Sequence, residues 1–121
     1  MQPNSFKLKR YLNNVGFYAT IDLEVNIESS CVLNIKYDET FVDEEWYSSL
    51  DFALRYVYEH YSKSGNKGLS VFVKKLHTMT GDTSQMVVVY VAIRCLCEVL
   101  GFTTEKLIML DEQTGRFILA K

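Results

Sequence analysis

The sequence predicts an α+β fold, a two-layer sandwich in which two helices cover one face of a four- to five-stranded sheet. Three observations predict it. Several stretches alternate apolar and polar residues with the period of a β-strand. One stretch repeats apolar residues at three- and four-residue steps, and another is a long, almost wholly apolar run that ends at a glycine. The resulting order, β-β-α-β-α-β-β, predicts an antiparallel or mixed sheet.

Length and composition indicate a single domain over residues 1–121. The 121 residues are 48% hydrophobic and 23% charged, which is enough to bury a core without metal or disulfide help. A formal net charge of −2 argues against a polybasic nucleic-acid coat or membrane binder. No apolar run reaches the roughly 18 residues of a membrane helix, and residues 1–14 lack the apolar core of a secretion signal. We therefore expect a cytoplasmic domain with no membrane association.

Residues 17–28 form the clearest strand of the sequence, because apolar and polar side chains alternate throughout. A second strand is predicted at 32–37, after a short turn at Ser29–Ser30. So short a turn predicts an antiparallel hairpin between the two strands.

The first 15 residues are weakly patterned. They hold a basic cluster, formed by Lys7, Lys9 and Arg10 between apolar neighbours. These features leave three interpretations open: an edge strand, a solvated arm, or an arm that contacts RNA.

The first helix is predicted over about 46–61, where apolar residues recur with helical spacing. Thr40 or Asp43 can cap its first amides. The helix ends in a glycine-containing loop at 62–68. Residues 69–76 then alternate as a third strand.

The second helix is predicted over about 84–100, with Asp82 or Thr83 as its N-terminal cap. Its β-branched start also suits a strand, but its length favours a helix. Arg94 and Glu98 are four residues apart, so they share a face and can pair. A closing hairpin is predicted within the last 20 residues, where two apolar segments flank a polar turn.

Cys31, Cys95 and Cys97 are an odd number of cysteines, so they cannot all pair within the chain. Cys95 and Cys97 point about 200° apart on the predicted helix. Neither His60 nor His77 lies at a zinc-ligand spacing from them. We therefore expect buried structural thiols, and no metal or cofactor.

Four tyrosines, Tyr47, Tyr56, Tyr58 and Tyr61, crowd the first predicted helix. Some of them must face solvent, because a helix cannot turn every side inward. Tyrosine is enriched at protein interfaces. The tyrosines therefore predict either an aromatic rim of the core or a surface for another protein or a second copy of the chain.

Three stretches carry a family resemblance. Gly16–Asp22 reads as the opening of a first strand, Trp46–Gly65 as a helix, and Gly68–Met86 as a strand, a loop and the start of a helix. In this order they resemble domain IV of elongation factor G and related translational GTPases, over about residues 14–101, with the closing hairpin of 102–121 outside. The resemblance implies a β-α-β fold and loops that contact ribosomal RNA. The chain has no GTPase phosphate-binding loop.

Three functions follow as hypotheses. The first is a non-catalytic protein-binding or regulatory domain that uses the four tyrosines. The second is an RNA- or ribosome-associated module that uses the loops at Asn14–Gly16 and Thr78–Thr83. The residues expected to contact RNA are Lys7, Lys9, Arg10, Lys74, Lys75 and His77. The third is an enzyme that uses His77 and Asp82, although the sequence contains no nucleophile elbow.

Overall fold

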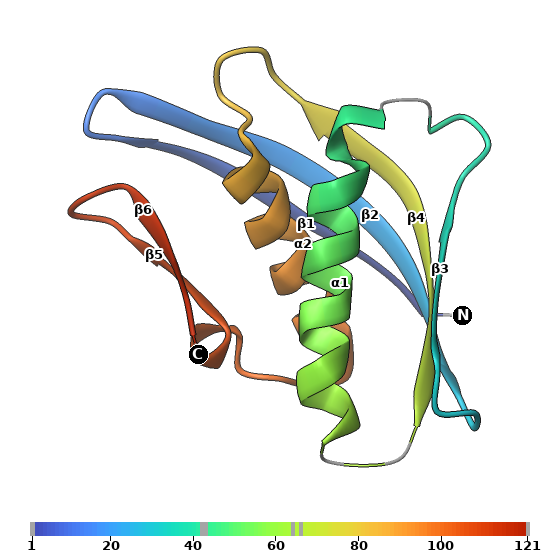
Figure 1. The fold of residues 1–121 in the computed structure, drawn as a ribbon. Helices are drawn as coiled ribbons and strands as arrows, with labels where there is room; N and C mark the ends of the chain where they lie inside the picture. Colours follow the sequence, from blue (N-terminus) through green and yellow to red (C-terminus); the bar gives the residue numbers. More distant parts are fainter. Residues whose placement is uncertain (1, 42–43, 64, 66, 121) are drawn as a thin grey trace.

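The computed structural model describes residues 2–41, 44–63, 65 and 67–120. Both helices lie on one face of a four-stranded sheet, and a separate two-stranded hairpin lies beside them (Figure 1). The elements are β1 (Gln2–Leu12), β2 (Val15–Glu28), β3 (Leu33–Tyr37), α1 (Tyr47–Ser62), β4 (Gly68–Thr78), α2 (Gln85–Leu100), β5 (Ile108–Asp111) and β6 (Arg116–Leu119). The predicted two-layer α+β fold is confirmed. From β2 onward the predicted element order is confirmed too, with β1 as an edge strand before it.

The order of strands in the sheet is β1-β2-β4-β3. β2 pairs antiparallel with β1 and with β4, whereas β3 pairs parallel with β4. The predicted hairpin between β2 and β3 is therefore wrong. The chain does reverse at the short turn, but β4 enters between the two strands after the excursion through α1.

Gly68 lets β4 begin directly beneath this turn. The Leu69 amide donates to the Val32 carbonyl at 3.0 Å. A Cβ on Gly68 would overlap the Ser30 carbonyl oxygen and lie 2.5 Å from the Val32 oxygen. The close approach of the two backbones thus depends on the missing side chain.

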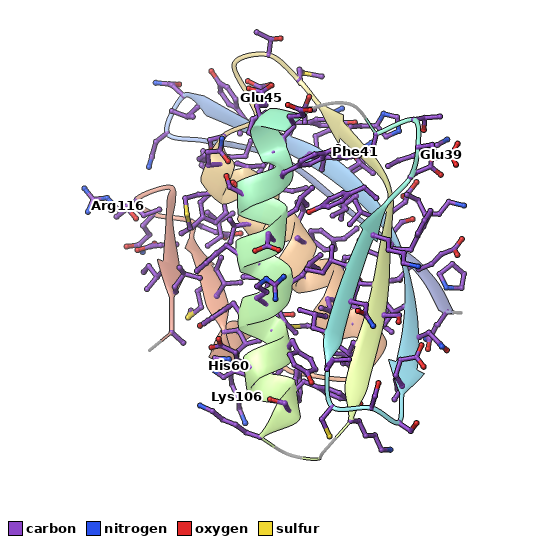
Figure 2. All side chains as sticks on the ribbon, turned by 45° about the vertical axis from the view of Figure 1, so that its right-hand side comes forward. Glu39, Phe41, Glu45, His60, Lys106 and Arg116 are labelled. Atoms are coloured by element: carbon purple, nitrogen blue, oxygen red, sulfur yellow. The ribbon has the colours of Figure 1, made fainter. Side chains whose placement is uncertain are left out.

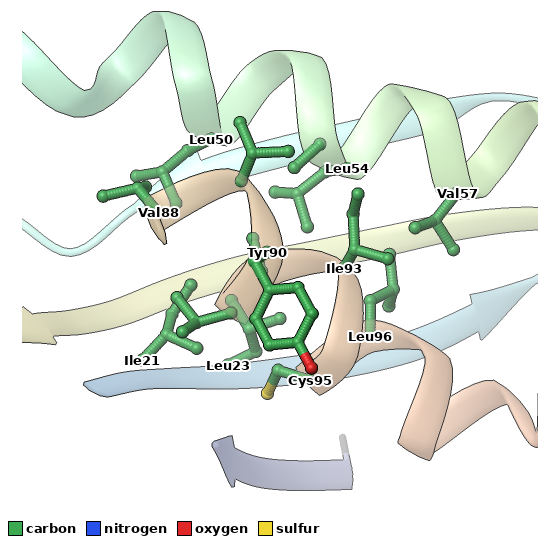
Figure 3. Close-up of a cluster of buried hydrophobic side chains, with 14 of the residues drawn as sticks. Ile21, Leu23, Leu50, Leu54, Val57, Val88, Tyr90, Ile93, Cys95 and Leu96 are labelled. Carbon is green, nitrogen blue, oxygen red and sulfur yellow. The ribbon is translucent and has the colours of Figure 1, made fainter. Parts of the chain in front are cut away.

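The core lies between the sheet and the helices. α2 packs on β1 and β2 and against α1, while α1 lies toward β3. Because α2 touches the sheet on one side and α1 on another, most of its surface is buried. Its β-branched start is helical, as predicted, and not a strand. Figure 3 shows the packed side chains, which include Ile21 and Leu23 of β2, Leu50, Leu54 and Val57 of α1, and Val88, Ile93 and Leu96 of α2.

The start of α1 differs from the prediction. A 3-10 turn at Glu44–Trp46 leads into the helix, and no described side chain caps it. Thr40 instead closes a turn on Asp38, to which its amide and hydroxyl both donate, at 2.9 and 2.7 Å. The second predicted cap, Asp43, lies outside the described residues.

The start of α2 also differs. Ser84 caps it and accepts from the Val87 amide at 3.2 Å. The predicted caps, Asp82 and Thr83, instead tie the preceding loop to β2. The Tyr18 amide donates to the Asp82 carbonyl at 2.9 Å, and the Thr83 hydroxyl donates to the Tyr18 carbonyl.

The predicted pair of Arg94 and Glu98 is not formed in the described part of the chain. Arg94 donates to the Tyr90 hydroxyl at 3.0 Å and stacks over the ring of Phe6 at 4.8 Å. Glu98 accepts from the Asn4 side-chain amide. Arg94 therefore contacts aromatic residues, and Glu98 contacts the edge strand β1, instead of pairing with each other as their helical spacing predicted.

The predicted closing hairpin is confirmed as β5 and β6. The Tyr56 hydroxyl lies within hydrogen-bonding distance of the carbonyls of Leu107 (2.9 Å) and Ala120 (2.7 Å), at the two ends of this hairpin. The Arg10 guanidinium pairs with Glu112 at 2.5 Å near its turn. Among the described residues, no helix is both long and apolar enough to cross a membrane.

The cysteines divide into two environments. Cys95 and Cys97 are buried on α2, as predicted, and burial raises the pKa of Cys95 to about 12 and that of Cys97 to about 11. Cys31 is exposed in the turn after β2, so the prediction of a buried thiol is wrong there. No cluster of three metal-ligating side chains occurs among the described residues.

Candidate nucleic-acid interface

The described helices leave one face of the sheet uncovered, and we call it the open face. Strand alternation directs apolar side chains of β2 and β4 toward the helices and the intervening side chains outward. The open face therefore carries Pro3, Ser5, Lys7 and Lys9 from β1, Tyr18, Thr20, Asp22, Glu24, Asn26 and Glu28 from β2, Ser70, Phe72, Lys74, Lys75 and His77 from β4, and Asn34 and Lys36 from β3.

A β-bulge in β4 puts two consecutive lysines on the open face. Leu23 pairs with Val73 and Asp22 pairs with Lys75, which leaves Lys74 as an extra residue. The predicted alternation over 69–76 therefore shifts phase at Lys74, and Leu76 turns back toward the covered face.

A basic patch occupies the β1 half of the open face. Lys7 lies opposite Thr20, which in turn lies opposite His77, so these residues form one row across three strands. Lys9 lies opposite Tyr18 in the next row. The Lys7 ammonium lies 5.9 Å from the centre of the Tyr18 ring. We define the basic patch as Lys7, Lys9, Tyr18, Thr20, Lys75 and His77.

The charge of this patch is opposite to that of the chain. Of the described carboxylates that border it, Asp22 lies opposite Lys75 and accepts a hydrogen bond from Ser5 at 2.6 Å, and Glu24 pairs with Lys74. The chain has 13 basic and 15 acidic residues. Four of the basic residues (Lys7, Lys9, Lys74 and Lys75) and two of the acidic ones (Asp22 and Glu24) fall in or beside the patch on β1, β2 and β4, which leaves nine and thirteen elsewhere. A locally positive field on an acidic protein is a footprint of anion binding.

The structure separates the six residues that the sequence assigned to RNA. Lys7, Lys9, Lys75 and His77 meet in the basic patch, and Lys74 borders it in an ion pair with Glu24 at 3.2 Å. Arg10 lies on the other side of β1, where it pairs with Glu112. Arg10 therefore holds the closing hairpin rather than extending the patch.

Two loops meet at the end of the sheet where the patch lies. Asn13 and Asn14, both with positive φ of 51° and 64°, form the turn between β1 and β2. The loop after β4 packs beside them, since the Asp82 carboxylate lies against Gly16, and a Cβ there would come within 2.6 Å of it. We call these the tip loops. Of the two segments that the sequence assigned to RNA as loops, Asn14 and residues 79–83 lie in the tip loops, whereas Val15 and Gly16 belong to β2 and Thr78 to β4.

Two of the four candidate interface tyrosines join α1 to other segments. Tyr47 donates to the Phe41 carbonyl at 2.9 Å and stacks on Tyr37 with ring centres 4.5 Å apart. Tyr56 holds the ends of the closing hairpin. Both side chains are half-buried.

The other two lie near the C-terminal end of α1. Tyr58 donates to the Lys67 carbonyl at 3.3 Å, before β4 begins. Tyr61 packs edge-to-face against Phe102, after α2. All four tyrosines therefore make contacts within the molecule, and the most exposed aromatic ring of α1 is Phe52.

The candidate catalytic residues are not joined. His77 lies on the open face, whereas the Asp82 carboxylate packs on Gly16. Neither a hydrogen bond nor an ion pair links the two within the described residues. His60 lies near Lys106 at the C-terminal end of α1 (Figure 2), where both line a shallow hollow. Its ring nitrogen Nδ1 lies 3.0 Å from the Tyr56 carbonyl.

Comparison with known proteins shows a shared fold. No family model and no curated protein matches the sequence. A crystal structure of a protein from Thermus thermophilus is similar, with a TM-score of 0.59 over 81% of this chain at 12% sequence identity. The chain spans only 16% of that protein's length. At this identity the likeness concerns the fold alone.

Proposed function

We propose that this domain is a non-catalytic module that binds RNA through the basic patch and the tip loops. The carrying observation is the gathering of Lys7, Lys9, Lys75 and His77 on one sheet face of an acidic protein. Lysines spaced over a flat surface match the phosphates of an extended strand, and Tyr18 supplies an aromatic surface among them.

The resemblance to domain IV of elongation factor G supports the same proposal. In that family the loops at the end of the domain contact ribosomal RNA, and the resemblance would give the tip loops of this chain the same role. We accordingly expect the RNA to be ribosomal and the protein to be cytoplasmic.

Salt-dependent binding tests the proposal. Fluorescence anisotropy with a labelled single-stranded RNA should show an affinity that falls steeply as salt rises, because binding releases counterions. Replacing Lys7 and Lys75 together by Gln should flatten the slope of log affinity against log salt by about 1.4, which is about 0.7 for each phosphate that is no longer neutralised.

Lys106→Gln is the matched control, because Lys106 is exposed but lies at the hollow beside His60, away from the open face. It should leave the slope unchanged. An affinity that does not depend on salt, or an equal loss in the control, would contradict the proposal.

Protein binding through α1 is the second candidate, favoured by the exposure of Phe52. Phe52 is 46% exposed, and its ring stacks on that of Tyr56 with centres 5.8 Å apart. A second copy of the chain is the partner to test first. Sedimentation velocity should then show a dimer that Phe52→Ser dissociates without a change in salt dependence; a monomer at all concentrations would exclude this form of association.

A further inference from the structure

The β3 half of the open face differs in chemistry from the basic patch. Asn26, Ser70 and Asn34 lie in one row across β2, β4 and β3. In the next row Phe72 lies beside Lys36. These side chains line a shallow hollow of about 370 Å³.

Phe72 is the aromatic side chain of this hollow. It stands in the outward phase of β4, where its neighbours are polar, and it remains partly exposed there. A second hollow borders the same ring on the side of Asp38 and Thr40. The Lys74 ammonium lies 5.8 Å from the ring centre while paired with Glu24. The ring therefore offers a stacking surface between two depressions.

Two of the polar side chains that line the hollow are held in place by a third, Glu28. The Glu28 carboxylate accepts from the Asn26 amide nitrogen at 2.8 Å and from the Ser70 hydroxyl at 3.1 Å. Asn26 lines the hollow, and its amide oxygen accepts no hydrogen bond within the described residues, so it is available as an acceptor. Asn34 has no hydrogen-bond partner within the described part of the chain, so both its donor and its acceptor are available.

We infer that this hollow binds one unpaired base of a single-stranded RNA. The base stacks on Phe72, its polar edge bonds to the amides of Asn26 and Asn34, and its phosphate lies near Lys36. The inference rests on the proposed RNA binding, since the basic patch then holds neighbouring phosphates of the same strand.

Charge and chemistry favour a base over a phosphate at this position. Glu28 lines the hollow and repels an anion, whereas a base is neutral. Amide side chains carry the donors and acceptors that base edges require, and aromatic rings on sheets commonly stack unpaired bases. A base within a duplex is already stacked and paired, so it cannot occupy the hollow. Lys74 would move from the ring toward the bound strand.

Two RNA probes and three variants test this site. The probes are an unstructured, mixed-sequence RNA oligonucleotide and the duplex that it forms with its complement. We expect the wild-type protein to bind the single strand more tightly. Phe72→Leu should weaken single-strand binding by about fivefold to 150-fold, the range for one stacked base, and leave duplex binding unchanged. Phe72→Tyr keeps a ring and should retain the affinity.

Met109→Leu is the matched control, because Met109 is an exposed apolar side chain on β5, in the hairpin beside the helices and away from the open face. It should change neither affinity, and thermal unfolding of every variant should match the wild type. If Phe72→Leu binds the single strand as tightly as the wild type, or if both probes bind equally, the base site is wrong and the basic patch alone binds RNA. If neither probe binds, both the proposed RNA binding and the base site are wrong.

Discussion

The two faces of the sheet are built from the same strands but are constrained by different forces. Along β2, Ile21 and Leu23 are buried under α2, while Thr20 and Asp22, one residue away, lie on the open face. Close packing determines which side chains fit on the covered face. On the open face neither burial nor packing requires a lysine or a ring at any position. The covered face therefore accounts for folding, and it is the open face that we propose carries the function.

Gly68→Ala should cause the largest loss of stability, because it displaces the backbone of β4, which carries side chains on both faces of the sheet. The new Cβ would overlap the Ser30 carbonyl, so β4 could not lie beside the turn. We expect a loss of more than about 4 kcal/mol in unfolding free energy, measured by urea denaturation. Gly65→Ala is the control, since a Cβ there meets nothing within 4 Å; equal stability of the two variants would contradict the role of Gly68.

Leu23→Ala compares the faces directly. Leu23 is 1% exposed, and its truncation leaves a cavity that we expect to cost about 3 kcal/mol. Thr20→Ala, on the open face of the same strand, should cost about 0.5 kcal/mol. The denaturation midpoints of the two variants measure this difference in stability. Equal losses in the two variants would show that the open face is buried in solution, for example by a second copy of the chain.

Arg10→Gln and Lys9→Gln compare neighbours on opposite faces of β1. Arg10 forms an exposed ion pair with Glu112, whose removal should cost about 0.2–1 kcal/mol and leave RNA affinity unaltered. Lys9→Gln should leave stability unaltered and lower the salt slope of RNA binding by about 0.7. An Arg10 variant that loses RNA affinity as Lys9→Gln does would show that the two faces are not separate.

Thiol labelling measures, without any substitution, whether the cysteines of the covered face are accessible in the native protein. Cys31 is exposed and should react with a disulfide reagent in the native protein. Burial raises the pKa values of Cys95 and Cys97 to about 12 and about 11, so both stay protonated and enclosed at pH 8. We expect one thiol to react before unfolding and three afterwards; rapid labelling of all three in the native protein would show that α2 opens.

The covered face was predictable because burial leaves a periodic pattern. The alternation of residues 17–28 and the apolar run of α2 located the strand and the helix correctly. The place of β4 between β2 and β3 was not predictable, because pairing between distant strands has no local pattern. The turn at Asn13–Asn14 did have a local sequence pattern, because asparagine tolerates positive φ. This pattern could have identified β1 as a strand of a hairpin with β2.

The candidate site was harder to predict for a related reason. Lys7, Lys9, Lys75 and His77 were predicted as RNA contacts, but only the strand register brings them together. Arg10 was grouped with them by its position in the sequence, although it lies on the other side of β1. Phe72 was not predicted as a site residue. It could have been recognised as an aromatic residue at one of the outward-facing, otherwise polar positions of its strand.

The central place of β4 also determines the order in which the molecule can be completed during synthesis. β1 and β2 are joined by a two-residue turn and can pair as soon as residue 28 has been made. β3 follows a few residues later, yet its partner ends only at residue 78. A nascent chain therefore holds β3 without a neighbour while α1 and β4 are translated, and the closure of this long loop should limit the folding rate.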